Sequence, residues 1–316
     1  MNIRKQVKQN ARRALSGNWG KVICIFLITA AIYIIFALMQ GVLSLIFNIP
    51  DFNDIFSSYQ YLNAPVIIPP ITLIMAAVFA VFSLIVNSPL MFGIKGWYYR
   101  MISGECGEIG TVFAFFSNMR LLLKTIWHDI VIAIRTVLWS IVFAVIPGTI
   151  CGFGALILNN PAYTDLYRLG GILLLILGGL LAVLSQIFIM IFTKRYFLSA
   201  YLIVEDNSIS VHKAIKTSVR YTKGSRFEIF VFHLSFLPWM ILSIFLLPLL
   251  YVAPYYGAAN ALYAKYLIER GKLNENEQRA VKNEQPSCTE AEAPQDSSED
   301  ANIAEDISGK DEADSL

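Results

Sequence analysis

Long segments without a charged residue are the feature that most restricts how this chain can fold. Residues 22–47, 66–94, 136–158 and 169–193 hold no Asp, Glu, Lys or Arg. A helix of about 20 residues crosses the hydrocarbon core of a bilayer, and each segment is longer than that. Only 15% of all residues are charged, against about 25% in soluble domains. The sequence therefore predicts an all-α integral membrane protein in which these segments are approximately the first four spans.

The last apolar region is too long for one span. Residues 229–264 contain no charged side chain over 36 positions. One straight helix of that length would reach about 54 Å, whereas the hydrocarbon core is about 30 Å thick. Pro248 would interrupt a regular helix near its middle. We therefore expect spans at 228–247 and 248–268, which gives about six in three hairpins. The alternative is one kinked span followed by an interfacial helix.

The positions of Lys and Arg predict the orientation. Segments 1–21, 95–135 and 194–227 carry six, five and seven of them, whereas 48–65 carries none and 159–168 carries one. Because short cytoplasmic loops are enriched in Lys and Arg, the first three segments are expected on the cytoplasmic side. With six spans, the N- and C-termini are both cytoplasmic. We expect a multi-pass membrane protein.

Two of the basic segments have the pattern of an amphipathic helix. In residues 1–21, Val7, Ala11 and Leu15 share one helical face and a glycine ends the pattern. Further along, Ser210 is placed to cap a helix that Gly224 ends. A weaker pattern covers residues 111–126. We therefore expect a cytoplasmic amphipathic helix before each of the three hairpins.

These patterns divide the chain into three regions. They are a basic amphipathic helix at 1–21, a polytopic membrane domain at 22–271 and an acidic tail at 272–316. The tail holds 13 acidic and four basic residues, whereas residues 1–271 hold 10 and 21. Because the tail has too few apolar residues to build a core, we expect it to be disordered and cytoplasmic.

Several stretches resemble a bacterial family of multi-pass membrane proteins. They are ARRALSGNWGKVICIFLI (11–28), SPLMFGIKGWYYRMISGE (88–105), LWSIVFAVIPGTI (138–150), RYFLSAYLIVEDNSISVHKAIKTSVRYTKG (195–224), LSFLPWMILS (234–243) and APYYGAANALYAKYL (253–267). The family is catalogued as domain of unknown function 975. The resemblance implies a multi-pass protein of the bacterial inner (plasma) membrane and a layout, and no activity. About 45 residues separate Pro147 from Tyr196, more than the family pattern has, so its span count is not carried over.

Enzyme motifs are absent from the sequence. There is no G-x-S-x-G, H-E-x-x-H or Walker A pattern, and the four cysteines stand apart. His128 and Asp129 are the only adjacent histidine and acid, and a solvated polar edge explains them better than catalysis. We expect no catalytic residue, no cofactor and no metal ion.

The basic segments carry the strongest functional signal. Basic residues beside a membrane each attract anionic lipid by about 1 kcal/mol, and the same charges also fix topology. The candidate partners of anionic phospholipid headgroups are Arg4, Lys5, Lys8, Arg12, Arg13, Lys213, Lys216, Arg220 and Lys223. Nucleic acid is not expected, because an amphipathic stripe next to membrane spans points to lipid.

Small side chains in the last span predict close helix packing. Gly257 and Ala261 have the spacing that lets two helices approach, within the bundle or in a homo-oligomer. Together, these features predict a non-enzymatic envelope protein that contacts anionic lipid or scaffolds a membrane-protein partner. The alternative is a transporter or lipid translocase, because apolar cargo does not require buried charge.

Overall fold

The structure is a computed structural model that describes residues 3–47, 70–105, 107–160 and 162–284. These residues form helices and connecting turns, with no strand among them. The chain divides into two units, Met1–Leu273 and Asn274–Leu316, which are considered separately. Residues 48–65, predicted as an extracytoplasmic loop, and the first residues of the second predicted span lie outside the described part.

Four helices of the described part are long and apolar enough to cross a membrane. They are α2 (Trp19–Ile46), α4 (Pro70–Ile102), α5 (Met119–Asn159) and α6 (Asp165–Thr193). The last of them continues as helical chain to Glu205. Few side chains in their apolar windows are buried, as expected for surfaces that face lipid. The described residues of the first four predicted spans therefore fall almost entirely within α2, α4, α5 and α6.

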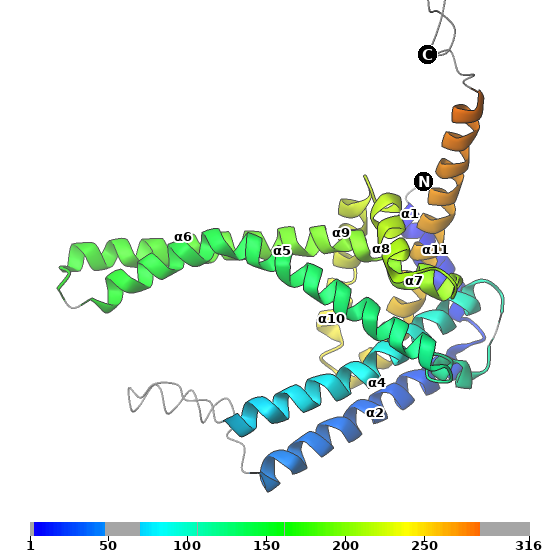
Figure 1. Cartoon of the computed structure of the whole chain (residues 1–316), viewed down its shortest axis with the longest axis horizontal. Coiled ribbons are helices and arrows are strands. Elements are labelled where there is room, and N and C mark those ends of the chain that lie inside the picture. Colours follow the sequence, from blue (N-terminus) through cyan, green and yellow to red (C-terminus); the bar gives the residue numbers. More distant parts are fainter. Residues whose placement is uncertain (1–2, 48–69, 106, 161, 285–316) are drawn as a thin grey trace, which may run out of the picture. The chain divides into compact units, whose positions relative to one another are not determined.

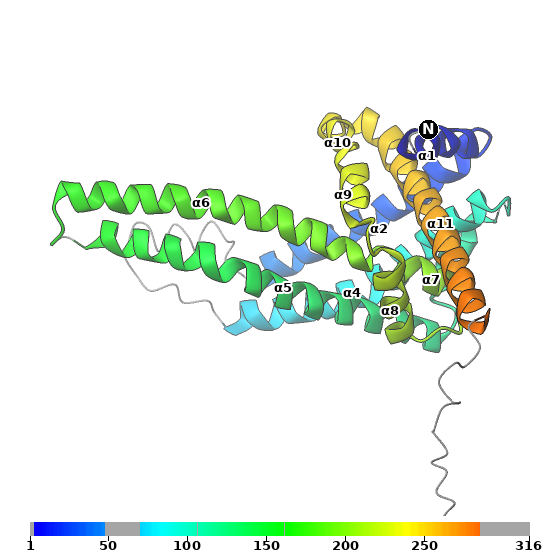
Figure 2. The same ribbon diagram turned by 90° about the horizontal axis from the view of Figure 1, so that it is seen from above.

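Small residues hold α5 and α6 together as an antiparallel hairpin, seen side by side in both ribbon views (Figures 1 and 2). A Cβ atom added to Gly154 of α5 would lie 2.9 Å from the backbone oxygen of Gly171 in α6. The hydroxyl of Ser185 donates a hydrogen bond to the carbonyl of Phe143 at 2.9 Å. Close backbone approach and an interhelical hydrogen bond are the usual means of helix association in lipid.

The α5 helix is longer than its apolar segment. It has 41 residues, or about 61 Å at 1.5 Å per residue, of which the predicted span covers only the second half. Residues 111–126 do not form a separate helix. Ile109–Phe113 is a short 3-10 helix, η1, and residues from Met119 onward already belong to α5. No glycine or proline interrupts the chain between Met119 and Ile146, so nothing breaks the helix.

Buried residues of α2, α4 and α5 form one core with residues of α1 (Ile3–Leu15), η2 (Lys194–Tyr196), α7 (Ser199–Glu205) and α8 (Val211–Tyr221). The predicted cap of α8 is confirmed, because the Ser210 side chain accepts a hydrogen bond from the backbone of Lys213. Gly17 and Gly224 follow α1 and α8 with φ of 93° and 82°, conformations that favour glycine.

The last apolar region forms three helices, α9 (Arg226–Leu234), α10 (Leu237–Leu242) and α11 (Leu246–Glu284). The break before α11 falls close to the turn predicted near Pro248. A fifth span is obtained if α8 and Arg226–Leu242, bent by 88°, form one broken span. The α11 helix is not among the candidate spans of the described part. Several of its small and aromatic residues, such as Ala258 and Tyr263, are buried in the core instead.

The acidic tail begins as helix. Residues 272–284, which the sequence analysis placed in the tail, continue α11. They include Glu, Gln, Lys, Arg and Ala, which are strong helix formers, and Arg279 pairs with Glu275 one turn away at 3.0 Å. Residues 285–316 lie outside the described part.

Candidate functional site: a basic pocket on the N-terminal helix

The apolar face of α1 is covered by protein. Val7, Ala11 and Leu15, which the sequence places on one stripe, are all buried in the core. The stripe is therefore not free to insert into a bilayer. Because the apolar side is fixed against the protein, the Lys and Arg residues of the helix must face outward or line its contacts with neighbouring helices.

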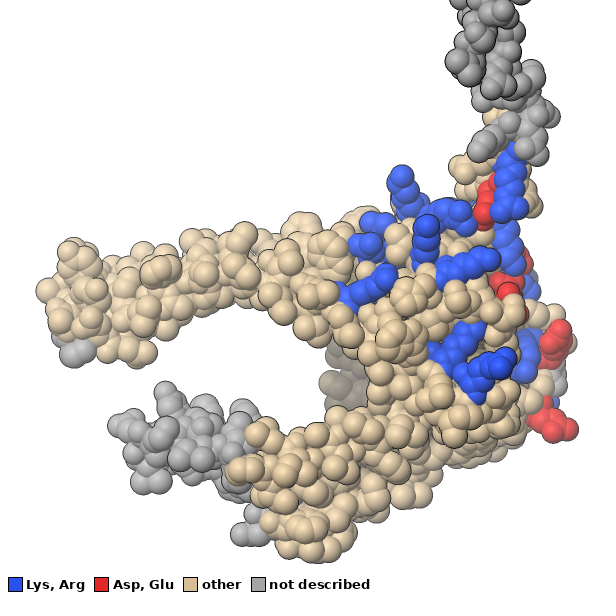
Figure 3. Space-filling model, in the orientation of Figure 1, with Lys and Arg blue, Asp and Glu red and all other residues tan. Residues whose placement is uncertain are grey.

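Four of those basic residues line a single pocket of about 580 Å³. Its walls are Lys5, Lys8, Gln9, Arg12, Arg13, Ser16 and Tyr255. Four side chains are cationic and no described residue in the wall is acidic. Figure 3 shows where the Lys and Arg side chains lie on the face drawn. They gather away from the far ends of the long membrane helices, whose visible surface carries no charged residue.

Contacts with the turn between α9 and α10 and with α11 hold two cations of this pocket in place. The Nζ atom of Lys8 donates to the carbonyl of Ser235 at 3.3 Å and lies 4.4 Å from the ring centre of Phe236. The guanidinium of Arg12 lies 5.2 Å from the ring centre of Tyr255. Aromatic faces attract cations, so both side chains have reduced freedom before any ligand arrives.

The electrostatics of the pocket are unfavourable without an anion. Burial lowers the pKa of Lys8 below its ordinary value, and the positive charges of Arg12 and Arg4 lower it further. A bound anion would oppose the repulsion between these cations. The pocket is therefore chemically suited to a phosphate or carboxylate group.

The other candidate headgroup partners lie elsewhere. Arg4 belongs to α1 but not to the pocket wall. Lys213, Lys216 and Arg220 are exposed on α8, and Lys223 is exposed just after it. As in α1, the apolar residues of α8, including Ala214 and Ile215, are buried in the core. The α8 residues thus form an open basic face, whereas the α1 residues form a pocket.

Gly257 and Ala261 lie at contacts inside the chain. A Cβ atom added to Gly257 would lie 2.6 Å from a ring carbon of Tyr98 in α4, and Ala261 is fully buried. The small side chain of Gly257 therefore makes room for the Tyr98 ring.

A second cavity, of about 480 Å³, was not anticipated from the sequence. Its walls come from α4, α5, α6, η2, α7, α9 and α11. Three charged groups line it, Lys95, Asp129 and Lys194, together with His128, His233, Asn260 and several tyrosines. These residues lie far apart in the chain, so no local motif could reveal the cavity.

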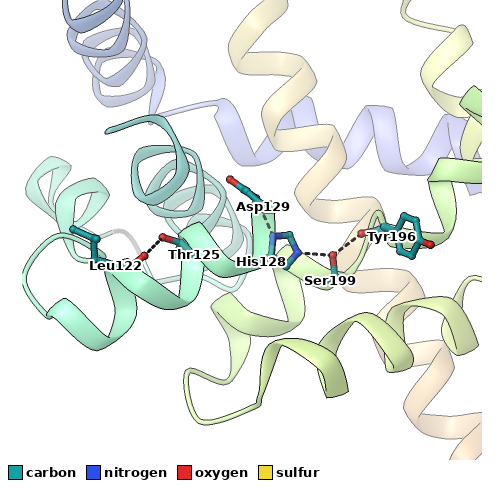
Figure 4. A network of polar contacts seen from close by, with 6 residues as sticks. All are labelled: Leu122, Thr125, His128, Asp129, Tyr196 and Ser199. Atoms are coloured by element: carbon teal, nitrogen blue, oxygen red, sulfur yellow. Dashed lines mark hydrogen bonds and ion pairs between the residues drawn. The ribbon is translucent and has the colours of Figure 1, made fainter. Parts of the chain in front are cut away.

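A hydrogen-bonded chain of side chains forms one wall of this cavity (Figure 4). The Nδ1 atom of His128 lies 2.9 Å from the Oδ1 of Asp129, and its Nε2 lies 2.8 Å from the Oγ of Ser199. The Ser199 hydroxyl donates to the backbone carbonyl of Tyr196 at 2.7 Å.

A carboxylate, an imidazole and a serine hydroxyl in contact one after another, here Asp129, His128 and Ser199, also occur in serine hydrolases. The geometry here favours a structural role. The Ser199 hydroxyl has two possible acceptors for its single proton, the carbonyl of Tyr196 at 2.7 Å and the Nε2 of His128 at 2.8 Å, so the backbone carbonyl competes with the imidazole for it. Ser199 is only 1% exposed, which restricts access of a substrate carbon. The chain of contacts instead joins α5 to the start of α7.

Comparison with known proteins identifies a family. No match was found among the curated proteins or the solved structures. One protein family matches residues 1–271. These residues include the helices α2, α4, α5 and α6, the α1 pocket and the second cavity. The chain therefore belongs to the family described as "Protein of unknown function (DUF975)".

Proposed function

We propose that this protein is a non-enzymatic protein of the bacterial plasma membrane that holds an anionic phospholipid headgroup in the α1 pocket. The observation that carries the proposal is the concentration of Lys5, Lys8, Arg12 and Arg13 around one pocket without a described acidic residue in its wall. The exposed basic residues of α8 add a diffuse attraction for the same lipids. Each basic residue near an anionic surface contributes about 1 kcal/mol.

The proposed arrangement has six spans in three hairpins, with α1 and α8 on the cytoplasmic surface and both termini in the cytoplasm. The hairpins α2–α4 and α5–α6 supply four spans, and α9–α10 with α11 supplies the third hairpin. In support, apolar residues from the three Lys- and Arg-rich segments, 1–21, 95–135 and 194–227, lie in one common core. Short loops on the cytoplasmic side are enriched in such residues. A partner membrane protein or a second copy would bind to the exposed hairpin surfaces.

Lipid that co-purifies with the protein tests this function. The full chain is purified from bacterial membranes in mild detergent, and phosphatidylglycerol per protein is measured by mass spectrometry. One variant replaces Lys5, Lys8, Arg12 and Arg13 with Gln, and a matched variant replaces Lys213, Lys216, Arg220 and Lys223 with Gln. We expect the α1 variant to lose the retained lipid and the α8 variant to keep it, because only the α1 residues form a pocket.

Two results would contradict the proposal. Retention of lipid by the α1 variant would show that the pocket does not hold it. Equal loss in both variants would show that net charge, and not the pocket, attracts lipid. Because exposed charges are screened within about 10 Å at 0.1 M salt, a wash at high salt should remove diffusely bound lipid first.

The second cavity favours a different function, that of a transporter or lipid translocase. Polar groups from several helices surround it, which is typical of a substrate site between spans. Vesicles that contain the protein and a fluorescent phosphatidylglycerol separate the two functions. Headgroup contact alone predicts no transbilayer movement of the probe beyond that in protein-free vesicles, whereas a translocase predicts movement that depends on the amount of protein.

A further inference from the structure

We propose that the second cavity binds a phosphate ester that also carries a hydrogen-bond donor, such as a hydroxyl group. This goes beyond the headgroup contact assigned to α1, because the cavity and the α1 pocket share no residue. The inference rests on three features of the cavity: its charge, an unpaired buried acceptor, and its size.

The charge of the cavity calls for an anion. Lys95 of α4 and Lys194 of η2 both line it, and Asp129 is the acidic residue among its described walls. The Oδ1 atom of Asp129 is held by His128 at 2.9 Å. The described walls thus hold two ammonium groups, one carboxylate and two imidazoles, so their formal charge is positive. Lysine is a common partner of phosphate, to which it presents a compact point charge.

A buried acceptor in the cavity wall, the side-chain oxygen of Asn260, predicts that the ligand also carries a hydrogen-bond donor. Asn260 of α11 is 8% exposed and lines the cavity. Its Oδ1 atom has no hydrogen-bond partner within the part of the chain that the structure describes. Buried side-chain acceptors in native proteins nearly always have a partner, from the protein, from water or from a ligand. A hydroxyl or amine on the ligand would supply the missing donor.

The size and the walls fit a small polar ester with an apolar extension. The cavity holds about 480 Å³, within the range of about 300–1,000 Å³ that ligand sites occupy. Ile94, Ile132 and Phe197 supply apolar wall, and Met91 is 40% exposed, so the cavity reaches the surface. Because Lys95 and Lys194 lie near the ends of membrane helices, the ester could be a lipid headgroup or a water-soluble molecule.

The wall is rigid before the ligand binds. His128 is fixed on both ring nitrogens, by Asp129 and Ser199, and the ring of Phe92 lies edge-on to it with centres 5.0 Å apart. On another wall, the Nδ1 of His233 donates to the carbonyl of Ile229 at 2.7 Å. A pre-formed site loses little conformational entropy on binding, so a small ligand can bind with measurable affinity.

Calorimetric titration of the full chain in a phosphate-free detergent tests the proposal with two probes. One probe is glycerol 1-phosphate, and the other is short-chain dihexanoyl-phosphatidylglycerol. The variants are Lys95→Gln, Lys194→Gln and Asn260→Leu, and the matched control is Lys216→Gln on the open face of α8. We expect each cavity variant to weaken binding by about tenfold or more, as loss of a charged or buried hydrogen bond does, and the control to bind as the parent does.

The two probes identify the source of the ester. Binding of the soluble probe indicates a metabolite, and binding of the lipid probe alone indicates a headgroup with its chains along the hairpins; either supports the proposal. It is overturned if neither probe saturates, or if Lys216→Gln weakens binding as much as Lys95→Gln. Asn260→Leu removes no charge. If it weakens binding of the probe while the melting temperature stays that of the parent, neither a general electrostatic effect nor misfolding explains the loss. All titrations are made on the protein in which Lys5, Lys8, Arg12 and Arg13 are replaced with Gln, so lipid held by the α1 pocket does not add to the signal and failure of the α1 proposal leaves this test unchanged.

Discussion

The Nε2 atom of His128 lies 2.8 Å from the Oγ atom of Ser199, although 71 positions separate the two residues. The contact ties the polar half of α5 to the first turn of α7. Both residues are buried, at 5% and 1% exposed, so water cannot replace the bond. It therefore fixes where the long helix α5 meets the core that carries α8 and α11.

Ser199→Ala should destabilise the protein by about 1–3 kcal/mol, because it leaves the buried Nε2 of His128 without a partner. Thermal unfolding in a mild detergent measures the change. Ser44→Ala is the control, since that exposed hydroxyl donates within its own helix, to the carbonyl of Gly41. A Ser199→Ala protein as stable as the parent would show that the contact does not join α5 to α7.

Much of the membrane part of the fold could be predicted from the sequence. Charge-free segments of more than 20 residues identified α2, α4, α5 and α6, because a bilayer imposes length and polarity directly on each helix. The cap at Ser210 and the glycine after α8 were also predicted, since both act within a few residues.

Features that depend on residues far apart could not be predicted. The amphipathic stripes of α1 and α8 pointed to lipid, but a helical stripe has the same pattern whether lipid or protein covers it. The core covers both stripes, as the burial of Leu15 and Ile215 shows. The cavity between Lys95 and Lys194 depends on how six or more elements meet, and no spacing within one segment encodes that arrangement.

Two adjacent glycines of α6 should respond differently to alanine. A Cβ atom on Gly178 would overlap the Sγ of Cys151 in α5, whereas one on Gly179 meets nothing within 4 Å. We expect Gly178→Ala to destabilise by about 1–3 kcal/mol through overpacking. Gly179→Ala should be neutral or stabilising by up to about 1 kcal/mol, because alanine favours the helix. Thermal unfolding of both variants measures the difference, and equal effects would contradict the packing of α5 against α6.

Gly257→Ala distinguishes packing inside the chain from packing between two copies. The added methyl group would meet the ring of Tyr98, so we expect a loss of about 1–3 kcal/mol in stability with no change in oligomeric state. Thermal unfolding and light scattering in detergent measure the two properties. Gly20→Ala is the control, since nothing lies within 4 Å of a Cβ there. Dissociation of a dimer at unchanged stability would instead place Gly257 at an interface between copies.

Arg12→Gln should raise the pKa of Lys8, because the positive charge of Arg12 is one of the causes that lower it. A lysine whose pKa is lower in the folded protein destabilises the fold while it is protonated. Stability should therefore increase as the pH rises through the folded pKa toward the ordinary value of about 10.4. Arg12→Gln should reduce this increase, as measured by unfolding at several pH values, and NMR of dimethylated lysine should report the pKa itself.

The same titration tests the anion pocket. Bound phosphatidylglycerol should raise the pKa of Lys8 as Arg12→Gln does, because a negative charge near an ammonium group favours its protonated form. In a detergent solution that contains only phosphatidylcholine, the pKa should keep its lowered value. Lys216, exposed on α8, is the internal reference in the same spectrum. A shift of Lys216 as large as that of Lys8 would show that the lipid acts on the whole basic surface and is not held in the pocket.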